Sequence, residues 1–136
     1  MNSELAGFWT LKSWLKLRAD GHTEAYCAAP IGGFLHYSAE GTMAVSIFKR
    51  ETAEILSTYG GRFEWDGHSV KHQAWEGWSP QGLEQPKVRH LQLTEDAMSM
   101  ETDWIEDQEA VYRYRLEWQR RAEPRIPAEH KSSDLA

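Results

Sequence analysis

Two side chains in the second half of the sequence, His72 and Arg89, have the chemistry to move a proton or to stabilise negative charge. Each lies in an alternating run that places it on the same strand face as an apolar neighbour, Val70 beside His72 and Leu91 beside Arg89. An imidazole titrates near neutral pH, whereas a guanidinium stays charged and donates hydrogen bonds. This pair is therefore suited to proton transfer with oxyanion stabilisation, or to holding an anionic or enolisable ligand.

A purely structural role is open for both residues. Glu76 shares their inward register and is a possible partner for Arg89, which could instead reach water at an open end of the fold. His72 could be an ordinary hydrogen-bonded interior histidine. The pattern of residues does not decide between these alternatives.

Other reaction chemistries have little support in the sequence. The remaining histidines fall in turns, on the outward register or near the C-terminus, and none has a metal-ligand spacing. Cys27 is the only cysteine, and neither a phosphate-binding glycine loop nor a Gly-x-Ser-x-Gly elbow is present. Haem on His72 would rest on that one histidine alone. We therefore expect no metal and no cofactor.

Composition sets the class of protein. A chain of 136 residues with 40% hydrophobic residues, seven of the residues being tryptophan, can bury one core. The formal net charge of −6 argues against nucleic acid or an anionic membrane as partner. No secretory signal and no membrane-spanning apolar stretch is apparent, so we expect a cytoplasmic protein.

Short runs of alternating residues separated by turn signals predict an all-β domain over residues 1–121, followed by a loose tail over 122–136. The fold predicted is an eight-stranded antiparallel up-and-down β-barrel, with one short helix at Thr52–Thr58 that could cover its mouth. The eight strands of this barrel are predicted at Phe8–Arg18, Gly33–Tyr37, Thr42–Phe48, Tyr59–Trp65, Ser69–Trp78, Lys87–Leu93, Met98–Trp104 and Ala110–Gln119, and a further short strand is predicted at Thr23–Cys27.

If Trp9 faces inward, alternation also places Ser13 and Leu15 inside and Trp14 outside. Outward Trp14 would join other large apolar residues on the outer wall, which predicts self-association as a homodimer. This outer set is Phe8, Trp14, Phe34, Phe48 and Trp75. The candidate ligand-binding residues are Tyr37, Met43, Phe63, Trp65, His72, Glu76, Arg89, Met100, Tyr112 and Tyr114, with His72 and Arg89 as the catalytic pair if the protein is an enzyme.

Several landmarks resemble those of a known family. Gly7-Phe8-Trp9 is similar to the Gly-x-Trp signature that opens the first strand of lipocalins. The further runs Gly33–Met43, Tyr59–Trp65, Val70–His72, Val88-Arg89 and Leu116–Trp118 follow in an order and spacing similar to the bacterial lipocalin-like domain family, over roughly residues 5–120. The resemblance implies an eight-stranded calycin barrel whose first-strand tryptophan closes the base against a basic residue of the last strand, here Arg120 or Arg121.

Three classes of function remain. The first is binding of a small hydrophobic or aromatic molecule inside the barrel, which the apolar inward set favours. The alternative is a cofactor-free isomerase, cyclase or lyase acting on a small aromatic or polyketide-like substrate in the same cavity. A barrel whose interior is filled by side chains would instead serve only protein association.

Overall fold

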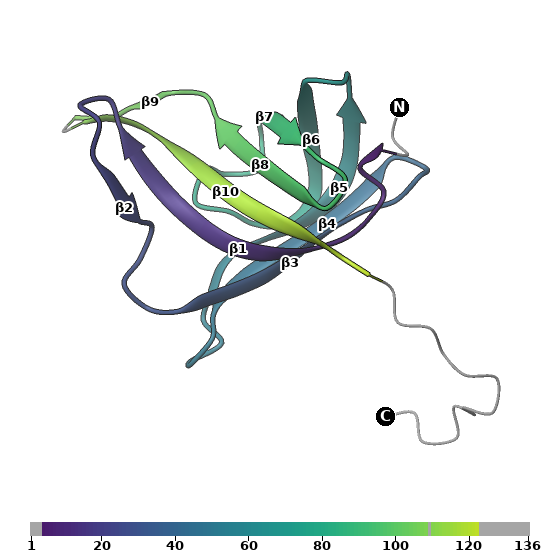
Figure 1. Ribbon diagram of the computed structural model, residues 1–136, viewed down its shortest axis with the longest axis horizontal. Coiled ribbons are helices and arrows are strands. Elements are labelled where there is room, and N and C mark those ends of the chain that lie inside the picture. Colours follow the sequence, from purple (N-terminus) through teal and green to yellow (C-terminus); the bar gives the residue numbers. More distant parts are fainter. Residues whose placement is uncertain (1–3, 109, 123–136) are drawn as a thin grey trace.

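The computed structural model describes residues 4–108 and 110–122, which form ten β-strands (Figure 1). The strands are β1 (Gly7–Arg18), β2 (Thr23–Ala25), β3 (Ile31–Tyr37), β4 (Thr42–Lys49), β5 (Ile55–Trp65), β6 (Ser69–Trp78), β7 (Lys87–Leu93), β8 (Ala97–Thr102), β9 (Ile105–Glu106) and β10 (Val111–Arg121). No helix among these residues is long and apolar enough to cross a bilayer.

Eight of the strands close into an antiparallel up-and-down barrel in the order β1-β3-β4-β5-β6-β7-β8-β10. Strand β10 closes the ring by pairing with β1, in a register that runs from Phe8 opposite Arg121 to Arg18 opposite Tyr112. Closure pairs the strand edges that an open meander would leave exposed. The eight-stranded barrel predicted from alternation is confirmed.

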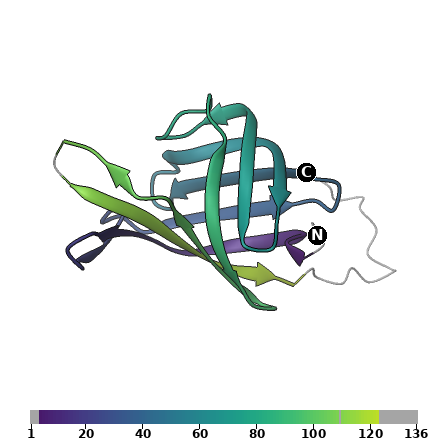
Figure 2. The same ribbon diagram turned by 90° about the horizontal axis from the view of Figure 1, so that it is seen from above.

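The two short strands lie outside this ring. Strand β2 pairs with the C-terminal half of β1, and β9 pairs with the N-terminal end of β10 (Figures 1 and 2). Both short strands are therefore attached to the two strands that close the barrel. The strand predicted to run from Thr23 to Cys27 ends at Ala25, and β9 was not predicted.

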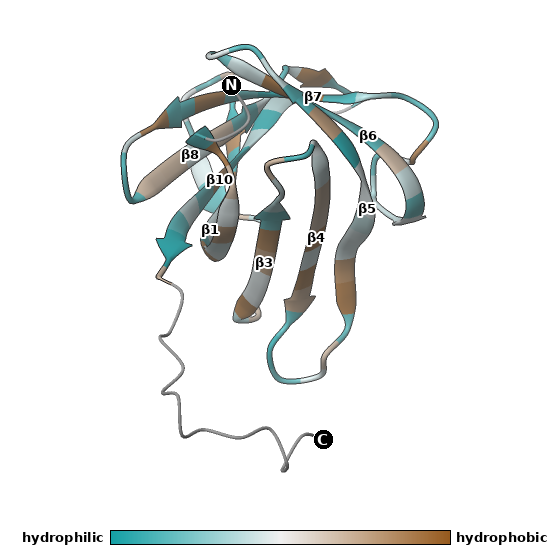
Figure 3. Ribbon diagram, turned by 90° about the vertical axis from the view of Figure 1, so that its right-hand side faces the viewer, coloured by the Kyte–Doolittle hydropathy of each residue, from teal (hydrophilic) through white to brown (hydrophobic). Residues whose placement is uncertain are grey.

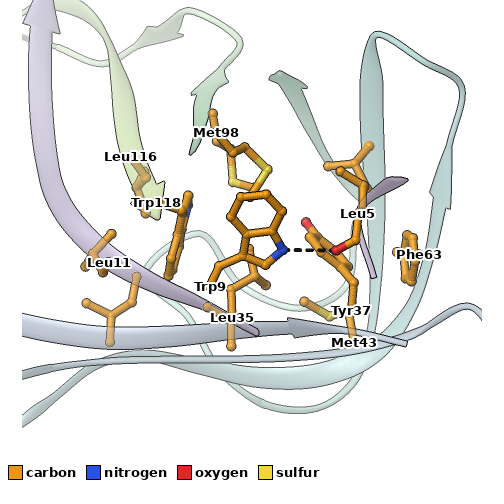
Figure 4. Close-up of a cluster of buried hydrophobic side chains, with 14 of the residues drawn as sticks. Leu5, Trp9, Leu11, Leu35, Tyr37, Met43, Phe63, Met98, Leu116 and Trp118 are labelled. Carbon is orange, nitrogen blue, oxygen red and sulfur yellow. Dashed lines mark hydrogen bonds between the residues drawn. The ribbon is translucent and has the colours of Figure 1, made fainter. Parts of the chain in front are cut away.

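The base of the barrel is filled by side chains. Trp9 and Leu5 are fully buried, and the Trp9 indole Nε1 donates to the Leu5 carbonyl oxygen at 3.0 Å (Figure 4). Tyr37, Phe63 and Trp118 belong to the same buried cluster. Figure 3 shows hydrophobic residues gathered along β3, β4 and β5, which form much of the wall around this core.

A β-bulge in β1 overturns part of the predicted inward set. Leu11 pairs with Trp118, but Ser13 pairs with Glu117, so Lys12 is an extra residue and the alternation reverses. Trp14, predicted outside, is buried with 6% of its surface exposed. Ser13, predicted inside, donates its hydroxyl to the Glu117 carboxylate at 3.0 Å on the exposed face, and Leu15 is only half-buried.

A second bulge changes the position of Glu76. Gly60 pairs with Glu76 while Gly61 pairs with Ala74, which leaves Trp75 as the extra residue of β6. The close approach requires glycine, since a Cβ on Gly61 would lie 2.0 Å from the Gln73 carbonyl oxygen. Glu76 is exposed, so the inward position predicted for it is wrong.

The helix predicted at Thr52–Thr58 is not present. The chain turns after β4, with Ala53 at a positive φ of 62°, and β5 begins at Ile55. Residues from Ile55 onward pair with β4, whose backbone supplies the hydrogen bonds that an isolated helix of this length could not retain in water. The predicted tail lies outside the described residues apart from Ala122.

Candidate functional site

Above the filled base, the barrel encloses a cavity of about 50 Å³. A water molecule needs roughly 10–15 Å³ of such space, so the cavity has room for a few waters or one small group. Three residues of the β6–β7 connection, Ser79, Pro80 and Gln81, are part of its lining. The cover at this end is therefore the β6–β7 connection rather than the segment after β4.

The cavity has one polar and one apolar side. Strands β5 to β8 and the β6–β7 connection provide the polar lining, which consists of Ser57, Tyr59, His72, Ser79, Gln81, Arg89 and Thr102. Strands β10, β1, β3 and β4 form the opposite half of the ring. Together with Met100 of β8 they provide the apolar and aromatic lining, which consists of Trp14, Leu35, Val45, Ile47, Tyr114, Leu116 and Trp118. Such a division suits a ligand with an apolar body and a polar group at one end.

His72 is buried and bridges two tyrosines. The Tyr37 hydroxyl lies 2.6 Å from Nε2, and the Tyr59 hydroxyl lies 2.8 Å from Nδ1. Burial, with a smaller contribution from the charge of Arg89, lowers the pKa of His72 to about 3. Burial also raises the pKa of both tyrosines, that of Tyr59 to about 12. At neutral pH all three side chains are therefore uncharged.

Arg89 faces the cavity from β7. Its Nη2 donates to the Gln81 side-chain oxygen at 2.8 Å, and its Nη1 donates to the Val88 carbonyl at 3.0 Å. Among the described residues no carboxylate lies within 4.0 Å of its guanidinium, and Glu76, considered above as a partner, is exposed. The positive charge of Arg89 is thus hydrogen-bonded but not neutralised by an ion pair within this part of the chain.

A second basic residue lies close by. Lys87 is buried, and its ammonium group donates a hydrogen bond to the Gly82 carbonyl oxygen. Its Nζ lies 5.6 Å from the centre of the Tyr59 ring. Burial lowers the pKa of Lys87. The polar side of the cavity is therefore next to two basic groups.

An outer groove of about 260 Å³ adjoins the cavity and includes Lys87 and Trp104 in its lining. Gln81, Arg89 and Thr102 line both spaces. The Gln81–Arg89 hydrogen bond thus lies between the interior and the surface. A ligand larger than the present cavity would have to displace Gln81 to enter by this route.

The residues predicted from the sequence separate into two groups. His72, Arg89, Met100 and Tyr114 line the cavity together, which confirms that His72 and Arg89 share one space. The others do not line it: Tyr37, Met43 and Phe63 are packed in the buried cluster, Trp65 donates its indole N–H to Glu4 at 2.9 Å, Tyr112 is half-buried, and Glu76 is exposed.

Two lining residues whose side chains hydrogen-bond to those of His72 and Arg89, Tyr59 and Gln81, were missed by the sequence-based prediction. Tyr59 is in phase with Gly61 and Phe63 along β5, so continuing the alternation toward the N-terminal end of that strand would have found it. Gln81 comes from a connection without periodicity, and no sequence signal places its side chain on Arg89.

A separate chain of polar groups lies on the outside of the barrel. The Ser69 hydroxyl lies 3.0 Å from His90 Nδ1, and His90 Nε2 lies 2.6 Å from the Asp103 carboxylate. His90 and Asp103 are largely exposed to water, and the three residues link β6 and β7 to the end of β8. We assign a structural role to these hydrogen bonds, which hold the three strands together.

The described residues contain no group of three or more His, Cys, Asp or Glu side chains that could hold a metal ion. Comparison with family models found no match, and no curated protein matches the chain. The resemblance to the bacterial lipocalin-like domain family therefore stays a prediction beside a barrel fold that is established.

Proposed function

We propose that the protein binds a small hydrophobic or aromatic molecule in the barrel cavity, which gains the necessary space when Gln81 is displaced toward the outer groove, with a polar group of the ligand facing Arg89. The observation that carries this proposal is the cavity itself, in which a cationic side chain without a described carboxylate partner faces an apolar and aromatic wall. A buried charge is costly unless it is compensated, and a ligand can supply that compensation.

The catalytic alternative has weaker support. A cofactor-free isomerase, cyclase or lyase needs a group that accepts a proton near the working pH, and such a group is most effective when its pKa is close to that pH. The pKa of His72 is lowered to about 3, and both ring nitrogens already have tyrosine hydroxyls as partners. These features favour binding over proton transfer by His72.

The cavity can be tested by filling it. Val45 is buried and lines the cavity, whereas its neighbour Ala44 is exposed on the same strand. Val45→Phe should abolish binding of benzoate and of benzyl alcohol, followed by isothermal titration and by native mass spectrometry. Ala44→Phe is the matched control and should leave binding unchanged. Equal binding by both variants would place the ligand outside the cavity and contradict the proposal.

A further inference from the structure

The hydrogen-bonded chain Tyr37–His72–Tyr59 runs from the filled base of the barrel to the cavity. Tyr37 is fully buried, and its ring centre lies 4.5 Å from that of Phe63 in the base cluster. Tyr59, at the other end of the chain, lines the cavity. His72 lies between them, with one tyrosine hydroxyl on each ring nitrogen.

The number of protons on the His72 ring limits how the three side chains can hydrogen-bond to one another. A neutral imidazole has one N–H donor and one acceptor nitrogen. One tyrosine must therefore donate its hydroxyl proton to His72, while the other accepts a hydrogen bond from His72. The accepting tyrosine keeps its own O–H, which is then available to a third partner.

The surroundings of the two hydroxyls show which tyrosine is the acceptor. In the described part of the chain, the Tyr37 hydroxyl has His72 as its hydrogen-bond partner, and Tyr37 is fully buried. If Tyr37 accepted from Nε2, its O–H would be left without an acceptor in the core, which is unfavourable. If Tyr37 donates to Nε2, then Nδ1–H donates to Tyr59. The free O–H in this arrangement belongs to Tyr59, whose side chain borders the cavity.

Arg89 adds donors to the same wall. A guanidinium has five N–H donors and no acceptor, and the contacts to Gln81 and Val88 use only two of its nitrogens, Nη2 and Nη1. The Tyr59 O–H and the Arg89 guanidinium can thus both donate hydrogen bonds to a group in the cavity. A ligand group that only accepts hydrogen bonds fits this wall better than a hydroxyl, which must also place a proton.

We propose that the ligand's polar group is a carboxylate or an enolate oxygen, held by Arg89 and by a Tyr59 hydroxyl that His72 and Tyr37 orient. This inference rests on the proposed binding function and specifies its ligand class. Tyr59 is a binding residue in this arrangement, whereas His72 and Tyr37 are positioning residues that act through it.

Two probes of the same size test the ligand class. Benzoate and benzyl alcohol share the phenyl ring, but only the alcohol carries a hydroxyl proton. By isothermal titration at pH 7.5, benzoate should bind at least about tenfold more tightly, as expected for hydrogen bonds to a charged group. Tyr59→Phe should remove about tenfold of the benzoate affinity and leave that of the alcohol nearly unchanged. Tyr112→Phe removes a hydroxyl outside the cavity lining and should change neither.

The direction of the hydrogen bonds in the series Tyr37–His72–Tyr59 can be measured without any ligand or variant. Nitrogen-15 NMR of the histidine-labelled wild-type protein should show His72 as the Nδ1–H tautomer, and an Nε2–H tautomer would overturn the assignment of the free hydroxyl to Tyr59. Equal affinity for the two probes would overturn the ligand class while leaving the binding function intact. Absence of saturable binding by either probe would overturn both proposals.

Discussion

Arg120 lies over the indole of Trp9, with its guanidinium carbon 4.2 Å from the centre of the ring. The two residues are paired across the seam where β10 closes on β1. Arg120 also donates to the backbone carbonyls of Glu4, Ala6 and Glu95. The prediction that a basic side chain of the last strand covers Trp9 is confirmed, with Arg120 rather than Arg121 in that position.

Trp9→Ala should therefore strongly destabilise the barrel. The side chain is completely buried, and truncating a large core aromatic residue costs about 3–5 kcal/mol. Urea unfolding followed by circular dichroism measures this loss. Trp75 is the matched control, because it is 60% exposed and Trp75→Ala should change the free energy of unfolding by less than about 0.5 kcal/mol. A loss below about 1 kcal/mol for Trp9→Ala would contradict the packing described here.

The sequence predicted the strand order and closure because alternation and turn residues are local signals. It failed where the backbone departs from regular alternation. The extra residues Lys12 and Trp75 each shift the register by one position, which moved Trp14 into the cavity lining and Glu76 to the surface. A bulge depends on pairing with a distant strand, so a pattern read along one strand cannot locate it. The Gln81 contact with Arg89 was not predictable either, because Gln81 lies in a connection that has no periodicity.

Arg89→Met should weaken benzoate binding while leaving the fold nearly intact. Removing a charge-assisted hydrogen bond to a ligand costs about 1.5–3 kcal/mol. Arg89 has no ion-pair partner among the described residues, so the substitution leaves no buried carboxylate without its partner in this part of the chain. Titration calorimetry and urea unfolding of the same preparation measure the two effects. An unfolded Arg89→Met variant would instead indicate that Arg89 is required for structure.

Gln81→Ala should strengthen benzoate binding. Gln81 accepts a hydrogen bond from Arg89 Nη2 and lines both the cavity and the outer groove. Removing this competing acceptor should make the free energy of benzoate binding more favourable by about 0.5–1.5 kcal/mol, the usual range for one hydrogen bond. Gln85 lines the outer groove but not the cavity, so Gln85→Ala is the control and should not change the affinity for benzoate. Weaker binding by Gln81→Ala would indicate that Gln81 contacts the ligand directly.

Self-association stays a prediction, with a smaller set of residues behind it. Trp14 is buried, but Phe8 and Phe34 are 42% and 43% exposed on the neighbouring strands β1 and β3. Phe8 also stacks on the ring of His36 at a centroid distance of 4.2 Å. We expect a homodimer at high micromolar concentration by light scattering, and we expect Phe34→Lys to return it to a monomer. A wild-type monomer at that concentration would contradict the prediction.

The last prediction concerns the pH dependence of stability. His72 has a pKa of about 3 in the folded protein, because burial disfavours the imidazolium, against an ordinary value of 6.5 in the unfolded chain. Between these two values the unfolded state binds a proton that the folded state does not, so acid favours unfolding. Stability is unaffected by His72 above pH 6.5 and decreases as the pH falls below it, by up to about 1.4 kcal/mol per pH unit.

His72→Gln isolates this contribution, because an amide can occupy the site between Tyr37 and Tyr59 without titrating. The comparison belongs between pH 6.5 and pH 5, above the range in which most carboxylates become protonated. Free energies of unfolding from urea titrations should fall with decreasing pH for the wild type and stay nearly flat for the variant, whatever their difference at pH 7.5. Equal slopes for the two proteins would mean that His72 becomes protonated in the folded state near pH 6, and that its hydrogen bonds to the two tyrosines do not persist in solution.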